Sequence, residues 1–230
     1  NGIFNSEQAF SVMGIGPQDN IFSIDAAELE QRLKKCPAIR RASVKRQISS
    51  NPTLLVDIDA RIPVAWIDCP ELGIHPGDAT YGALADKEGA IFPCMEQVHM
   101  PYIREKRMPS VTLRPPSSGK LSYGVSIREL EAPMKLIELL SGTVTEYLPS
   151  IVSITTPNDW SFCVRFTNDC QATFSHYGLE HQVEKLSRAL RHARQTHRKI
   201  SSINLIPEHN IPVIFDNSYE DIPLAEPIEE

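Results

Sequence analysis

The sequence predicts an α/β (α+β) fold with two modules, in which two helices and two strands are followed by a mainly antiparallel β-domain with flanking helices. Two observations carry this prediction. Capped amphipathic helices alternate with short runs of β-branched and other apolar residues. The pattern also changes after residue 67, where long elements give way to short strands separated by turns. We therefore expect two successive units of structure along the chain.

Two capped helices open the first module. Asn5 begins a capping box that includes Gln8, and Gly14 ends the short apolar stripe that follows. Asp25 caps a second helix, with Glu28 three residues later. The apolar residues of the second helix recur on one face, as expected for a helix that packs against a sheet.

Two strands complete this module, at residues 39–48 and 53–67, with a turn between them. Arg61 and Pro63 interrupt the second run, where a buried central strand would tolerate neither. Two strands covered by two helices make a thin fold, so we expect a third strand ahead of the first helix. The chain starts at Asn1, which predicts that this strand and a further N-terminal segment have been removed.

The second module alternates short strands with helices. A hairpin is predicted at residues 83–92, around a charged turn that contains Gly89. Residues 93–124 are rich in Pro, Ser and basic residues and are predicted to be irregular. The remaining predicted elements are a helix from Ser126 to Gly142, strands at 151–155, 161–166 and 171–175, a helix at 179–199, and strands at 200–206 and 211–215.

Composition bounds the function. The chain has 230 residues, 41% hydrophobic content and a formal net charge of −6, which argues against wholesale binding to nucleic acid. The last fifteen residues, 216–230, hold six acids and no base, and we expect them to be disordered. No apolar run approaches the roughly 18 residues of a membrane-spanning helix.

The five cysteines are scattered and form no C-x-x-C pair. Cys69 and Cys94 could meet if their strands are neighbours, although buried free thiols are the favoured interpretation. Cys163 or Cys170 beside a histidine could form a nucleophile pair, but neither lies in a recognisable nucleophile motif. The histidine spacings do not suit a metal site. We therefore predict no enzyme activity, no cofactor and no metal.

Several segments, in order, resemble the POTRA domain of bacterial division proteins of the FtsQ/DivIB family. They are residues 20–25, residues 37–46, the Pro52-Thr53-Leu54 turn with Val56, and the run from Arg61 to Trp66. In this pattern a helix ends at a proline, a basic strand follows, and an Arg-x-Pro-Val-Ala strand leaves for the next domain. Ala60 departs from the family, which usually has an acid there.

The second half resembles the β-domain of the same family more loosely. Residues 86–92 fit its acidic hairpin with a glycine, and residues 179–205 fit its closing helix and strand. The resemblance implies a POTRA-like domain at 1–66, a β-domain at 67–215 and an acidic tail at 216–230. It also implies that Arg61 and Pro63 lie where the chain crosses between the two domains.

The resemblance implies a non-catalytic scaffold of the divisome, anchored by an N-terminal transmembrane helix. It would lie at the periplasmic or extracytoplasmic face of the inner membrane at the division site. Its partners would be small bitopic coiled-coil division proteins and the septal peptidoglycan synthase complex. In the family such a partner docks at the end of the β-domain, which implies binding residues in the last strands: Ile203, Leu205, Ile211, Val213 and Phe215.

The docking strand also has a feature that opposes pairing. Pro212 lacks an N–H group, so on an open sheet edge it would remove one bond to an incoming strand. Prolines also protect edges against unwanted pairing. Docking and edge protection therefore both remain open for residues 211–215.

A basic cluster in the first module is the second candidate surface. It could face a membrane or an acidic partner, although a solvated face is the ordinary explanation of such a run. The residues are Lys34, Lys35, Arg40, Arg41, Lys45 and Arg46.

Two other classes of protein stay open. The first is a POTRA-type chaperone or secretion component, which would bind polypeptides by the same edge pairing. The second is a hydrolase, which would need a clustered Cys-His-acid site in a cleft. The basic face of the helix at 179–199, with Lys185, Arg188, Arg191, Arg194 and Arg198, is that of an ordinary amphipathic surface helix.

Overall fold

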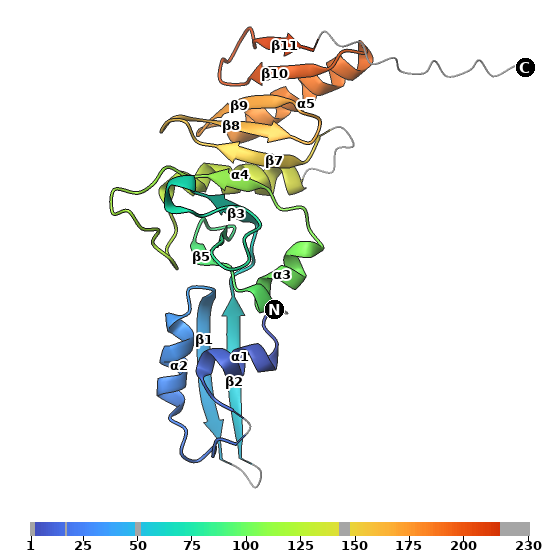
Figure 1. Cartoon of the computed structure of the whole chain (residues 1–230). Coiled ribbons are helices and arrows are strands. Elements are labelled where there is room, and N and C mark those ends of the chain that lie inside the picture. Colours follow the sequence, from blue (N-terminus) through green and yellow to red (C-terminus); the bar gives the residue numbers. More distant parts are fainter. Residues whose placement is uncertain (1–2, 17, 49–51, 143–147, 217–230) are drawn as a thin grey trace, which may run out of the picture.

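Two sheets follow one another along an elongated molecule. The computed structural model describes residues 3–16, 18–48, 52–142 and 148–216, so the predicted acidic tail, apart from Asp216, lies outside the described residues. In Figure 1 a two-stranded sheet forms the lower end, with its strands along the long axis, and a nine-stranded sheet forms the rest. The protein is mixed α/β, as predicted.

Both predicted helices of the first part form, with caps that set the helix boundaries. Asn5 Oδ1 accepts a hydrogen bond from the Gln8 N–H at 2.8 Å, and Gly14 ends the helix with a φ of 68°. Asp25 Oδ1 accepts from the Ala27 N–H at 2.8 Å. The elements are α1 (Ser6–Met13), α2 (Ala26–Lys35), β1 (Ile39–Gln47) and β2 (Thr53–Ala60).

The predicted single strand at 53–67 is wrong, because it is two strands in two sheets. β2 pairs with β1 and ends at Ala60, whereas β3 (Ala65–Asp68) belongs to the nine-stranded sheet. Pro63 lies between them and needs no ladder partner there. The sheet of β1 and β2 contains only these two strands among the described residues, and the third strand expected ahead of α1 stays a prediction.

Arg61 joins the two sheets at this crossing. Its guanidinium donates to Asp86 Oδ2 at 2.6 Å, to the Pro37 carbonyl at 3.1 Å and to the Gly124 carbonyl at 3.0 Å. The planar fork of an arginine suits three acceptors on three separate segments. The side chains of Arg61 and Asp86 are only 11% and 7% exposed. An arginine therefore stands in this run because it connects the two parts of the molecule.

The second sheet is mixed, with five antiparallel and three parallel pairs. Its strand order is β11-β10-β9-β8-β7-β6-β3-β4-β5. Besides β3 the strands are β4 (Ala83–Ala85), β5 (Ile91–Pro93), β6 (Ser110–Thr112), β7 (Ile151–Thr155), β8 (Ser161–Phe166), β9 (Gln171–Ser175), β10 (Ile200–Asn204) and β11 (Val213–Phe215). A short 3₁₀ helix, η1 (Pro70–Leu72), follows β3.

The prediction of an irregular segment at 93–124 is wrong in two places. Helix α3 (Glu96–Arg104) forms despite Pro101, and β6 runs between β3 and β7 inside the sheet. Each is short and flanked by residues that ordinarily mark loops. Val111 of β6 has an exposed fraction of 0%, so this segment supplies part of the core.

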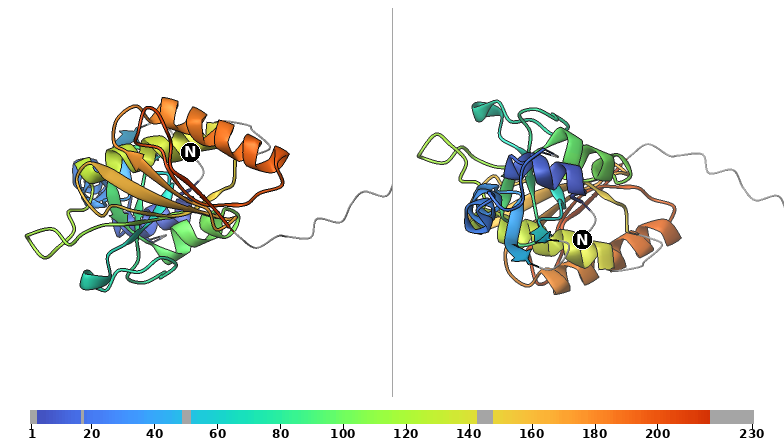
Figure 2. Two further views of the ribbon diagram at one scale, coloured as in Figure 1. Left: turned by 90° about the horizontal axis from the view of Figure 1, so that it is seen from above. Right: turned by 90° about the horizontal axis from the view of Figure 1, so that it is seen from below.

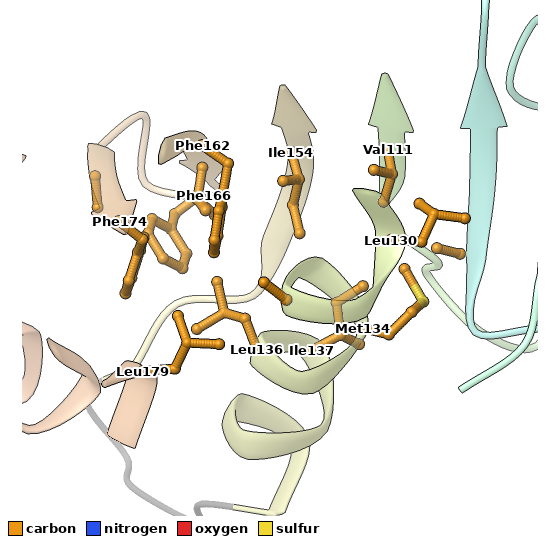
Figure 3. Packing of buried hydrophobic residues seen from close by; sticks show 14 of the residues in the cluster. Val111, Leu130, Met134, Leu136, Ile137, Ile154, Phe162, Phe166, Phe174 and Leu179 are labelled. Carbon is orange, nitrogen blue, oxygen red and sulfur yellow. The ribbon is translucent and has the colours of Figure 1, made fainter. Parts of the chain in front are cut away.

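Helices α4 (Arg128–Gly142) and α5 (Leu179–Gln195) lie on the same side of the strands in Figure 2. Figure 3 shows the phenylalanines of the sheet, Phe162, Phe166 and Phe174, close to Leu136 and Leu179 of these helices. All five are at most 2% exposed. The main core therefore lies between this face of the sheet and the two helices.

The sheet topology keeps Cys69 and Cys94 apart. β4 lies between β3, which precedes Cys69, and β5, which precedes Cys94. Their strands are therefore not neighbours, and both thiols are free and buried. The other three cysteines are also free.

Candidate functional site

The two edges of the nine-stranded sheet differ in how they are covered. At the β5 edge, the Gly124 N–H donates to the Ile91 carbonyl at 2.7 Å, and Ala90 bridges to Ser126. At the other end of the order, β11 pairs only with β10. Within the described part of the chain, β11 therefore presents an edge with backbone groups available to an incoming strand.

The pairing of β11 settles which way its backbone groups point. The Asn204 N–H donates to the Pro212 carbonyl at 3.0 Å, and the Asp216 N–H donates to the Lys199 carbonyl at 2.8 Å. The backbone groups of Pro212 and Asp216 therefore face β10, and this direction alternates from one residue to the next along an antiparallel strand. Val213 and Phe215 lie between them in the alternation, so their N–H and C=O groups face the open edge.

Pro212 consequently does not remove a hydrogen bond from the open edge, which was one of the two alternatives for this strand. A residue directs its N–H and C=O to the same side of an antiparallel strand. Because the Pro212 carbonyl bonds Asn204, the missing N–H also belongs to the side of β10. The hydrogen bond that Pro212 lacks is one within the sheet, and the open edge keeps the donors of Val213 and Phe215.

The five predicted binding residues divide into two groups by burial. Ile203 and Leu205 are 2% and 0% exposed, so their side chains belong to the core and cannot contact a partner directly. Ile211, Val213 and Phe215 are half-buried and pack against the edge of the same core. What the structure offers to a partner here is thus the backbone of β11, with the exposed side chain of Ile214 beside it.

Arg198 adds a contact that sequence reasoning missed. Its guanidinium carbon lies 3.7 Å from the centroid of the Phe215 ring, a cation–π arrangement. No sequence signal pairs these residues, because Arg198 follows α5 and Phe215 lies on the last strand. The stacking holds Phe215 and places a positive charge beside the open edge.

Lys185 does not belong to the exposed basic face that we expected for α5. It is 8% exposed, and its ammonium donates to the Pro207 carbonyl at 2.8 Å. The lysine therefore fixes the segment after β10 instead of facing solvent. Arg188, Arg191 and Arg194 are exposed, as expected for an amphipathic helix.

Three of the six residues of the basic cluster are paired with acids. Lys34 bonds Glu30 at 2.5 Å, Arg40 bonds Glu88 at 2.7 Å and Arg41 lies 3.4 Å from Asp59. These pairs reduce the positive field that would attract a membrane or an acidic partner.

The remaining members of the basic cluster do not gather into one site. Arg46 donates to the Ile24 carbonyl, which ties β1 to the segment before α2. Lys35 and Lys45 are exposed on α2 and β1. A shallow pocket brings together only Lys34, Arg40 and Arg41 of the predicted set, so binding by the whole cluster stays a prediction.

The structure gives no support to Cys163 or Cys170 as a nucleophile, a role that the sequence alone did not decide. Burial raises the pKa of the Cys163 thiol and raises that of Cys170 to about 11. Both therefore remain protonated at neutral pH and are poor nucleophiles. Among the described residues, no group of three or more His, Cys, Asp or Glu side chains is placed to hold a metal ion.

No helix in the described ranges combines the length and the apolar composition that crossing a bilayer requires.

Comparison with known families gives one match. The family model described as POTRA domain, FtsQ-type, matches residues 3–59, which contain α1, α2, β1 and most of β2. No curated protein matches the chain.

Proposed function

We propose that the chain, whose residues 3–59 match the FtsQ-type POTRA domain, belongs to the FtsQ/DivIB family and is a non-catalytic scaffold of the bacterial divisome. It binds small bitopic coiled-coil division proteins and helps to recruit or regulate the septal peptidoglycan synthase. It acts at the extracytoplasmic face of the inner membrane, held by an N-terminal transmembrane helix. The POTRA domain at 1–66 and the β-domain at 67–215 act as successive modules.

The open edge of β11 is the observation that carries this proposal. Strand addition uses main-chain bonds for affinity and neighbouring side chains for specificity. β11 offers the outward groups of Val213 and Phe215, with Ile214 exposed beside them. The core residues Ile203 and Leu205 hold β10 and so keep this edge in place. A scaffold that gathers partners needs such a surface and no reactive groups.

A POTRA-type chaperone has less support, because one backbone donor on the outer edge of β1 already has a side-chain partner. The Val44 N–H, which would meet an added strand there, donates to Glu30 Oε2 at 3.1 Å. Hydrogen bonds from Lys34 and Val44 hold the pKa of Glu30 below its usual value, so the acceptor stays ionised at neutral pH. A polypeptide that paired with β1 would have to displace this carboxylate.

The experiment compares two variants on neighbouring residues of the edge. Purified residues 1–230, Val213→Pro and Pro212→Ala are used to capture proteins from a membrane extract, and the captured proteins are identified by mass spectrometry. Val213→Pro removes an outward N–H, so we expect recovery of short coiled-coil membrane proteins to fall by about tenfold, the equivalent of ~1.4 kcal/mol. Pro212→Ala changes only the side of β10 and should keep full recovery.

Circular dichroism spectra equal to that of the unmodified protein establish that both variants fold. Equal recovery by both folded variants would place the binding surface away from β11. If the unmodified protein captures no division protein, the scaffold function itself is contradicted.

A further inference from the structure

A polar pocket of about 510 Å³ opens where several strands of the nine-stranded sheet end. β6, β7 and β9 run in the same direction, and the segments that follow their last residues line the pocket. Helices α4 and α5 both begin there, because residues at the start of each helix line the pocket. In α/β sheets, ligands bind outside the carboxyl ends of parallel strands. Neither the strand edge nor the POTRA domain contributes to this pocket.

Three cationic side chains line the pocket: Arg114, which follows β6, and Arg128 and Lys135 of α4. Arg114 pairs with Asp159 and Lys135 pairs with Glu180. All four of these side chains are more than half exposed. Because exposed ion pairs contribute only about 0–1 kcal/mol, an incoming anion can replace the present partners with little loss.

A polar atom without a partner lies in the same wall. His176 Nε2 is buried and has no hydrogen-bond partner in the described part of the chain. The ring packs edge-on against Phe162, with the centroids 5.4 Å apart. Buried polar atoms ordinarily have a partner, so a ligand hydroxyl or oxygen is one explanation of this exception.

An exposed aromatic residue lines the pocket. This residue is Tyr177, which is 79% exposed. The backbone at Tyr177 is fixed, because its carbonyl accepts from Ser175 Oγ at 2.8 Å and from Gln182 Nε2 at 2.6 Å. Large aromatic rings held in solvent are available to pack against an apolar face of a ligand.

We propose that this pocket binds an anionic sugar, which is a sugar ring that carries a phosphate or a carboxylate group. The cations receive the anionic group, and Tyr177 packs against the ring. Glu129, Glu131 and Asp159 also line the pocket. These carboxylates oppose a bare anion, but they accept hydrogen bonds from ring hydroxyls. The combination of cations, carboxylates and an aromatic ring therefore favours an anionic sugar over inorganic phosphate.

The test is calorimetric titration of residues 1–230 with four probes: glucose 6-phosphate, glucuronate, glucose and inorganic phosphate. We expect a Kd on the order of 1 mM for at least one of the two anionic sugars. Glucose and phosphate should bind at least roughly tenfold more weakly. The difference between glucose 6-phosphate and glucuronate tells which anionic group the pocket prefers.

Single substitutions distinguish binding in this pocket from non-specific attraction of anions to the protein surface. Arg128→Ala and Tyr177→Ala should each weaken binding by about tenfold. Arg107→Ala and Tyr81→Ala change exposed residues of the same types outside the pocket and should have no effect. Glu129→Gln should weaken the binding of a sugar, because a neutral amide oxygen accepts a weaker hydrogen bond from a ring hydroxyl than a carboxylate does, whereas it would strengthen the binding of a bare anion.

Three results would overturn the proposal: no binding of either anionic sugar, equal binding of inorganic phosphate, or unchanged affinity in Tyr177→Ala. Each can be obtained whether or not β11 binds a division protein, because the two surfaces share no residue.

Discussion

His99 is a fully buried titratable residue in the second part of the molecule. Its exposed fraction is 0%, and its Nδ1 accepts from the Met95 N–H at 2.9 Å at the start of α3. Nε2 has no partner within the described residues. Burial lowers the pKa of His99 to about 4. The neutral ring thus serves as a helix cap inside the core, and a charged ring would be unfavourable there.

The lowered pKa predicts a loss of stability in acid. In the unfolded chain the histidine pKa is about 6.5, so the unfolded state takes up a proton first as the pH falls. The contribution of neutral His99 is complete above pH ~6.5 and is lost as the pH falls towards ~4. Between pH 7 and 4.5 this loss amounts to about 2–3 kcal/mol.

His99→Gln should therefore show a smaller fall in the free energy of unfolding over this range, measured by urea denaturation at pH 7 and pH 4.5. His181→Gln, whose side chain is 62% exposed, is the matched control and should behave as the unmodified protein does. An unchanged pH dependence in His99→Gln would mean that His99 does not titrate between these values.

At the scale of whole elements, local signals predicted most boundaries. Asn5 and Gly14 enclose α1, and β7, β8 and β9 occupy the residues that alternation predicted. Helix caps, turns and the alternation of strand residues depend on residues that are neighbours in the sequence, so the sequence alone is enough to predict them. The position of the candidate docking strand was also predicted, although only its last three residues are strand.

What could not be predicted depends on partners distant in sequence. β6 has three residues beside Pro109, and only the neighbours β3 and β7 make it a strand. The direction of the Pro212 imide likewise depends on which side of β11 faces β10. Burial of Ile203 and Leu205 depends on α5, which packs on β10. Periodicity gives two faces to a strand but does not say which face a partner covers.

Because β6 contributes to the core, we predict that the substitution of valine by alanine destabilises the protein more in β6 than at an exposed position. Val111→Ala removes buried methyl groups from a site that is 0% exposed, and we expect a loss of about 2 kcal/mol in the free energy of unfolding. Val125→Ala makes the same change at a residue that is 56% exposed and should stay within about 0.5 kcal/mol. Urea denaturation measures both, and equal effects would show that β6 is not part of the core.

At the scale of the molecule, the two sheets are connected by more than the chain that crosses between them. Arg61 connects Pro37 of the first part to Asp86 and Gly124 of the second. Arg40 of β1 bonds Glu88 beside the same hairpin turn at 2.7 Å. A shared apolar cluster lies next to these bonds: Ala38, Trp66, Leu84, Phe92, Cys94 and Ile103. Such an interface resists the relative motion that is usual between domains.

This junction predicts that the two parts unfold together. Calorimetry of residues 1–230 should show one heat-absorption peak. In Arg40→Ala/Arg61→Ala the buried partner Asp86 loses its cation, and breaking a buried pair typically destabilises a protein by about 3–5 kcal/mol. We expect the double variant to unfold in two steps, because the parts then lose much of the contact that makes their unfolding cooperative.

The matched control is Arg41→Ala/Arg188→Ala, which removes two exposed arginines whose acid partners, Asp59 and Glu184, lie within the same part of the molecule. It carries the same change in charge and should keep a single peak, because exposed pairs contribute little. If the control splits as well, net charge and not the junction governs cooperativity. If Arg40→Ala/Arg61→Ala keeps one peak at a lower temperature, the apolar cluster around Ala38 is sufficient to couple the two sheets.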